Sequence, residues 1–170
     1  MRLRWVILGV LSACLSAPAS LADPVEVVTR ISQFSGKQVP RFEMLKYSAV
    51  NGRTGPSRDH AVQWRYERQG LPVMIIKESA NWRRVRDPSG AEVWMHARML
   101  TAGDDVMLQA DTMLKAKPDE AAKDVAFFGE GVLADLGQCQ ADWCQVSAKG
   151  LTGWARRSAL WGADISEAGL

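Results

Sequence analysis

Four residues in the first half of the chain have side chains that can hold a small anionic or flat ligand. Asn51 and Arg53 lie two positions apart in the turn NGRTGPSRD, and together they can hydrogen-bond a carboxylate. Trp82 and Arg84, in the run NWRRVR, offer a flat aromatic face for sugar or peptide groups and a further guanidinium. Residues three apart on a strand point to opposite faces, so a buried Val85 would place Trp82 on the outer side or at the rim. We take these four residues as the candidate ligand site.

The plainer alternative is that the tryptophans complete small hydrophobic cores and that the arginines form a solvated face. Large aromatic side chains supply buried area that small modules otherwise lack. We apply this interpretation to Trp94 and Trp154 and leave Trp82 open between core and ligand platform. The basic residues of the first half can suit the carboxylates of peptides or the phosphates of lipids; they are Arg83, Arg84, Arg86 and Arg98.

The sequence does not favour catalysis. Cys139 and Cys144 are separated by four intervening residues, close enough for a disulfide across a tight hairpin. A thiolate metal site would need further ligands near them, and the two histidines, His60 and His96, lie far away in the sequence. The chain has no nucleophile elbow, zinc-protease motif or phosphate-binding glycine loop. We therefore expect no enzyme activity, no metal and no cofactor.

The first 22 residues have the form of a secretory signal. Arg2 and Arg4 precede an apolar run, and small residues lead to a cleavage point after Ala22. The run is too short for a transmembrane anchor. Acylation at Cys14, in a lipobox-like Leu-Ser-Ala-Cys, is the alternative to cleavage after Ala22, which we favour. We expect an exported, periplasmic protein.

Export changes the charge of the chain. Loss of Arg2 and Arg4 brings the 21 basic residues to 19, equal to the 19 acidic ones. A neutral, exported chain has neither the charge nor the access that nucleic-acid binding requires.

The remaining sequence repeats one pattern of short strands and turns. Gly70 and Trp82 are twelve residues apart, as are Gly131 and Trp143. Runs of four to seven β-forming residues, broken by Gly, Pro, Asn and Asp, predict an all-β fold. We expect a linker at residues 23–40 with at most one short element, two modules at 41–101 and 106–162, and a tail at 163–170. Modules of about 60 residues are marginal alone, so we also expect them to pack together or to need a staple such as Cys139–Cys144.

The run NGRTGPSRDHAV, followed by GLPVMIIKESANWRRVRDPSGAEVWMHARML, resembles the bacterial SH3-like family. The likeness is strong in the first copy, whereas the second matches in spacing and replaces the Asn-x-Arg run with Thr112-Met113-Leu114. The resemblance implies two tandem SH3-like small β-barrels, each five-stranded and strongly bent. It also implies a non-catalytic module of the cell envelope. The implied ligand is peptidoglycan, held by Asn51, Arg53, Trp82 and Arg84, and the alternative is an adaptor for another envelope protein.

Overall fold

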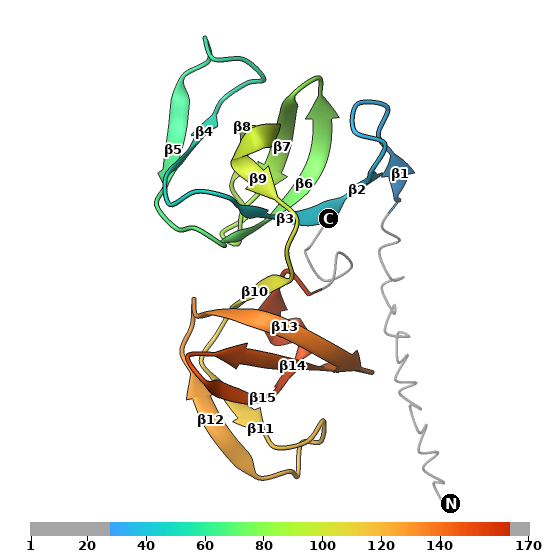
Figure 1. The fold of residues 1–170 in the computed structure, drawn as a ribbon, viewed down its shortest axis with the longest axis vertical. Coiled ribbons are helices and arrows are strands. Elements are labelled where there is room, and N and C mark those ends of the chain that lie inside the picture. The colour runs from blue at the N-terminus through green and yellow to red at the C-terminus, as the bar shows by residue number, and fades with distance from the viewer. Residues whose placement is uncertain (1–27, 164–170) are drawn as a thin grey trace, which may run out of the picture.

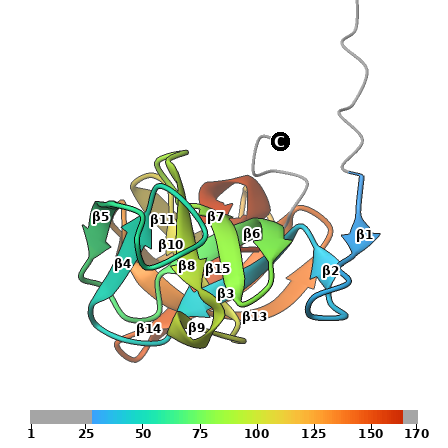
Figure 2. The same ribbon diagram turned by 90° about the horizontal axis from the view of Figure 1, so that it is seen from above.

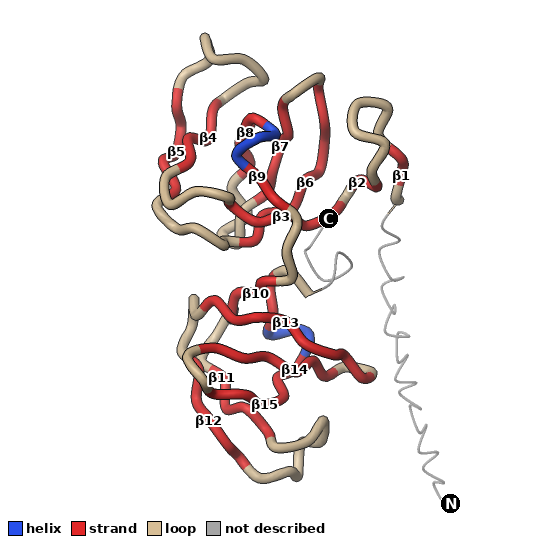
Figure 3. The backbone as a smooth tube through the Cα atoms, in the orientation of Figure 1, coloured by secondary structure: helices blue, strands red, loops and turns tan. Residues whose placement is uncertain are grey.

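The computed structural model describes residues 28–163, and within them the chain is all-β, as predicted (Figures 1 and 3). An N-terminal hairpin leads into a first domain and then a second domain, which lie one above the other in Figure 1. The predicted signal and Cys14 fall outside the described residues, as does the tail from residue 164. No helix in the described part of the chain has the length and apolar character needed to cross a membrane.

Each domain is built on a sheet of seven short strands. The first domain comprises β3 (Arg41–Leu45), β4 (Val50–Arg53), β5 (Val62–Tyr66), β6 (Pro72–Ser79), β7 (Trp82–Arg86), β8 (Glu92–His96), a 3-10 turn (Ala97–Met99) and β9 (Leu100–Thr101). The second domain comprises β10 (Asp105–Leu108), β11 (Thr112–Lys115), β12 (Asp124–Phe128), β13 (Leu133–Gln140), β14 (Trp143–Ala148), β15 (Leu151–Arg156), a 3-10 turn (Arg157–Ala159) and β16 (Leu160–Trp161).

The two sheets have the same topology, which confirms the duplication predicted from the sequence. The strand order is β5-β4-β8-β7-β6-β3-β9 in the first domain and β12-β11-β15-β14-β13-β10-β16 in the second. The sheets are bent but are not closed barrels, because the outermost strands do not pair with each other. Register shifts after Ile75 in β6 and after Leu136 in β13 mark irregularities of the kind that bend a strand.

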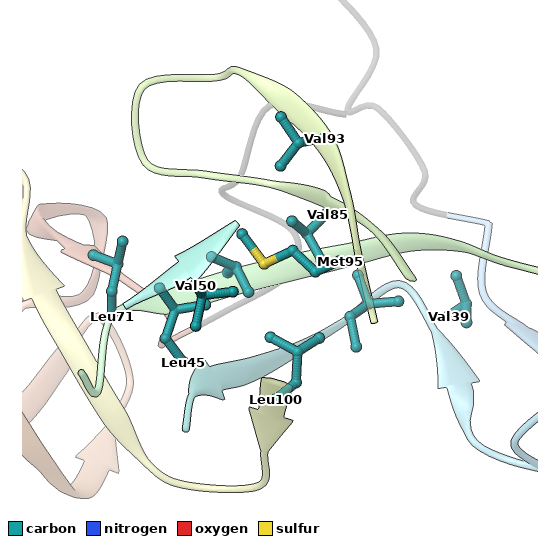
Figure 4. Close-up of a cluster of buried hydrophobic side chains, with 10 residues drawn as sticks. Val39, Leu45, Val50, Leu71, Val85, Val93, Met95 and Leu100 are labelled. Atoms are coloured by element: carbon teal, nitrogen blue, oxygen red, sulfur yellow. The ribbon is translucent and has the colours of Figure 1, made fainter. Parts of the chain in front are cut away.

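Each domain has its own hydrophobic core. Figure 4 shows the first, where side chains from successive strands meet, among them Val85, Val93 and Met95, all essentially inaccessible to solvent. The second core is built around Val106, Leu114 and Val146. Strand alternation places these residues inward and leaves the intervening side chains on the outer face, where the candidate site lies.

The stretch expected to be a linker carries a hairpin, β1 (Arg30–Ile31) paired with β2 (Gln38–Val39). Figure 2 shows this hairpin beside β6. Val39 enters the first core, and Glu78 of β6 accepts hydrogen bonds from Ser32 Oγ (2.6 Å) and Ser35 Oγ (3.0 Å). Sequence patterning missed this docking because the partner residue is more than forty positions away.

The two domains pack directly on each other. Trp161 of β16 donates a hydrogen bond from Nε1 to the carbonyl of Pro72 (2.9 Å), and its ring meets that of Phe42 edge-on at 5.2 Å between centroids. Met107 and Leu133 of the second domain pack against the core of the first. This contact supplies the mutual packing expected for two modules of marginal size.

The predicted disulfide is present between the facing strands β13 and β14. Cys139 and Cys144 are register partners, with an S–S distance of 2.02 Å and a Cα–Cα distance of 4.1 Å.

Candidate functional site

A cavity of about 230 Å³ opens on the outer face of the first domain, and we call it the basic pocket. It contains three of the four residues predicted to bind ligand: Asn51, Arg53 and Trp82. Its full lining is Ala49, Asn51, Arg53, Arg58, Arg65, Trp82, His96, Arg98 and Met99.

Strand pairing brings these distant residues together. Asn51 of β4 pairs with Arg65 of β5, and Trp82 of β7 pairs with His96 of β8. The rings of Trp82 and His96 meet edge-on, 5.4 Å between centroids. Trp82 is half-buried while Val85 is fully buried, which confirms that the two side chains take opposite faces.

The turn after β4 is held in shape by its own side chains. Arg53 Nη1 donates to the carbonyls of Arg58 (3.0 Å) and His60 (2.7 Å). Ser57 Oγ lies 2.9 Å from His60 Nδ1. A Cβ atom at Gly55 would come within 2.3 Å of the His60 ring, so a larger residue here would displace that ring. Arg53 therefore lines the pocket and, through Nη1, also holds the loop that carries Arg58 to it.

The basic pocket is strongly electropositive. Four arginines line it and no carboxylate does, and only Arg65 has an ion-pair partner within the described chain, Glu67 at 2.9 Å. Burial and the charges of Arg98, Arg58 and Arg83 lower the pKa of His96. His96 is therefore neutral at neutral pH, and its Nδ1 accepts a hydrogen bond from the Arg98 backbone N–H (3.3 Å).

Arg84 lies outside the basic pocket. Its Nη2 forms an ion pair with Glu92 Oε2 at 2.7 Å on the neighbouring strand. The sequence analysis included it as a further guanidinium near Trp82, but the pocket extends from Trp82 toward β4 and the 3-10 turn instead.

The core assignment of Trp94 from the sequence is wrong. Trp94 is half-buried on the outer face, whereas its neighbours Val93 and Met95 fill the core. The residue equivalent to it in the second domain, Trp154, is buried as predicted.

Sequence reasoning also missed that Arg58, Arg65 and His96 line the site. A turn arginine and a histidine at a strand end carry no local signal of this kind. They become pocket residues only through the pairing of β4, β5 and β8.

Trp143, the residue of the second domain that is equivalent to Trp82, is covered by other side chains. Trp143 pairs with Arg156 in the same register in which Trp82 pairs with His96. The Arg156 guanidinium stacks over the Trp143 ring at 4.2 Å and is held there by Glu120, 2.9 Å from its Nη2. Trp143 is buried under this pair, whereas Trp82 remains accessible at the wall of a cavity.

The polar groups of the pocket are also replaced in the second domain. The cross-strand pair Asn51 and Arg65 corresponds to Met113 and Phe127, which are about half exposed. The two copies therefore present different chemistry at one structural position, basic in the first domain and apolar in the second.

Among residues 28–163 no group of three or more His, Cys, Asp or Glu side chains is arranged to hold a metal ion.

The fold and the site together define a class: a tandem pair of small bent β-sheet modules with a basic surface pocket on one copy. The family model for the bacterial SH3 domain matches residues 46–101 and again residues 112–162. The chain belongs to the bacterial SH3 domain family, with two copies in tandem.

Comparison with solved structures gives remote matches. The structure of NlpC2 from Trichomonas vaginalis is 12% identical, with a TM-score of 0.34 over 72% of this chain and 48% of that chain. NlpC1 from the same organism is 12% identical, with a TM-score of 0.33 over 80% of this chain and 50% of that chain. The chain thus spans about half the length of these two proteins. No curated protein matches it.

Proposed function

We propose that this chain is an exported, non-catalytic protein of the cell envelope that binds peptidoglycan through the basic pocket of its first domain. Bacterial SH3 domains are typically non-catalytic and are commonly cell-wall binding modules. The secretory character of the first 22 residues supports export, and the disulfide fits an oxidising compartment.

The observation that carries the proposal is the composition of the basic pocket. Four guanidiniums, one amide and one accessible indole surround it, and no carboxylate neutralises it from within. Peptidoglycan offers the complementary groups, because its stem peptides carry carboxylates and its sugar and peptide units have flat faces that stack on an indole.

A solvent-exposed ion pair contributes only about 0.2 to 1 kcal/mol. A single pocket therefore binds weakly, and the repeated ligands of the wall polymer raise the retention of the protein by rebinding. Charges at a surface are screened over about 10 Å at 0.1 M salt, so binding should weaken as salt rises.

Co-sedimentation with purified sacculi tests the proposal. The protein beginning at Asp23 should pellet with the wall at low salt and less so at moderate salt. The double variant Arg58→Gln, Arg98→Gln should stay in the supernatant. Lys123→Gln, which removes an exposed charge from the second domain, is the matched control and should pellet like the wild type.

The second candidate function is a protein–protein adaptor, favoured by the apolar surface of the second domain. Met113 and Phe127 are cross-strand neighbours, and Val125 lies two residues before Phe127 on the edge strand β12. All three side chains are about half exposed. Failure of the wild type to pellet with sacculi in either buffer would contradict wall binding and favour this second function.

A further inference from the structure

We infer that the basic pocket recognises the free C-terminal carboxylate of a peptide, together with the one or two small residues that precede it, and does not bind the glycan. The inference rests on the proposed function and specifies which part of the wall polymer the pocket takes. In a cross-linked wall such ends belong to stem peptides whose own C-terminal carboxyl has not been used in a cross-link, so the protein would select these positions in the network.

Two guanidiniums of the pocket are available to a ligand. Within the described chain, the side chains of Arg58 and Arg98 have no carboxylate at ion-pair distance, unlike those of Arg65 and Arg84. Both line the same cavity as His96. A carboxylate there can accept bonds from a planar guanidinium in a bidentate arrangement.

His96 lines the same cavity and carries a further hydrogen-bond donor. Because its Nδ1 accepts from the Arg98 backbone, the neutral ring carries its proton on Nε2. Arginine side chains have no acceptor, so the anion-facing part of the pocket is made of donors. This arrangement fits a deprotonated acid and disfavours a neutral hydroxyl-rich sugar, which needs acceptors as well.

The rest of the lining suits a short peptide end better than a free phosphate. Trp82, Met99 and Ala49 give an apolar wall, which a methyl side chain can contact and an inorganic anion cannot. The side-chain amide of Asn51 offers both a donor and an acceptor, the pair that a peptide bond requires.

The size of the cavity also favours a chain end. Its volume of about 230 Å³ is below the roughly 300 to 1,000 Å³ of pockets that enclose a drug-sized ligand. The last one or two residues of a peptide need less room than a disaccharide unit.

Isothermal titration of the protein from Asp23 onward tests the inference with four probes. These are N-acetyl-D-alanyl-D-alanine, its C-terminal amide, peptide-free glycan strands and inorganic phosphate. We expect the acid to bind, and the amide and the glycan to bind at least about tenfold more weakly. Phosphate should compete only at about tenfold higher concentration than the acid. Equal binding of acid and amide, or phosphate as effective as the acid, would overturn the inference.

Variants assign any binding to the pocket. Arg58→Gln and Arg98→Gln should each weaken binding of the acid by up to about fivefold, while leaving the already weak binding of the amide unchanged. Trp82→Ala should also weaken binding of the acid. Trp64→Ala removes an exposed tryptophan outside the pocket and should leave this binding unchanged. Unchanged thermal unfolding of the variants would show that they fold. Loss of acid binding in Trp64→Ala but not in Trp82→Ala would refute the assigned site.

The sacculus experiment separates this inference from the proposed function. If an excess of N-acetyl-D-alanyl-D-alanine does not reduce sedimentation with sacculi, and the protein shows no preference for this acid over its amide, the inference is overturned and wall binding stays intact. Binding of the acid probe without sedimentation would support the carboxylate site and overturn the proposed wall function.

Discussion

The substitution Glu78→Gln tests how the N-terminal hairpin is fastened to the first domain. The Glu78 side chain is 1% exposed and lies within 2.8 Å of Arg41 Nη1 and 3.1 Å of Arg83 Nε. It also accepts the two hydrogen bonds from Ser32 and Ser35 of the hairpin. Gln keeps the size of the side chain but removes the charge that all four donors face.

The expected loss of stability follows from these contacts. Removing one partner of a buried ion pair costs about 3 to 5 kcal/mol. Arg41 retains Glu43, and Arg83 retains the carbonyls of Ala80 and Trp82, so the lower end of the range applies. A loss of about 3 kcal/mol corresponds to a midpoint lower by about 6 to 12 °C.

The effect should depend on pH. Burial alone would raise the pKa of Glu78, but the hydrogen bonds from Ser32, Ser35 and Arg41 and the charge of Arg41 together lower it. A carboxyl with a lowered folded-state pKa stabilises the protein above its unfolded pKa of about 4.3. This stabilisation is lost as the pH falls through the folded value. The difference between wild type and Glu78→Gln should therefore be full at pH 7 and shrink in acid.

Urea denaturation at pH 7 and at several acidic pH values, monitored by tryptophan fluorescence, measures both effects. Glu67→Gln is the control, because its ion pair with Arg65 is largely exposed and should contribute less than about 1 kcal/mol. A change below about 0.5 kcal/mol for Glu78→Gln at pH 7, or a larger change that persists undiminished in acid, would refute the reasoning.

Three further predictions follow from contacts elsewhere in the molecule. Trp161→Phe keeps an aromatic ring but leaves the buried Pro72 carbonyl without its donor, so the free energy of unfolding should fall by about 1 to 3 kcal/mol; no change in a denaturation curve would contradict the domain contact. Replacing both Cys139 and Cys144 by Ala removes the disulfide that closes a small ring, so the free energy of unfolding should fall by about 2 kcal/mol. Reduction of the wild type is the parallel measurement, and equal stability of the oxidised and reduced protein would contradict this prediction. An NMR titration of the His96 ring should give a pKa below the ordinary value of about 6.5, because burial and nearby arginines disfavour the imidazolium; a pKa at or above that value would mean that the guanidiniums do not surround it.

The amino-acid sequence by itself determined the features that depend on local spacing. Strand alternation and turn residues fixed the all-β class, and the repeated distance between Gly70 and Trp82 revealed the duplication. Side chains alternate between the two faces of a strand, and this alternation placed Trp82 on the face opposite to Val85. The short separation of five positions between Cys139 and Cys144 was enough to predict their disulfide.

Only the tertiary structure decided where the chemistry gathers. Arg58, His96 and Arg98 join Asn51 because β4 and β8 pair across more than forty residues, a contact that no local pattern encodes. Strand alternation identifies which side chains point inward, but it does not show how far the opposite face is covered. Trp94 was therefore assigned to the core, although it lies on the outer side.

The tertiary structure also decided that only one of two equivalent tryptophans lines a pocket. Trp143 is closed off because Arg156 is held over it by Glu120, a residue of a distant turn. Both tryptophans occupy matching places in the repeat, so the sequence pattern predicts the position of each. Burial depends on what the neighbouring strands and loops bring to that position, and this is set by the folded chain as a whole.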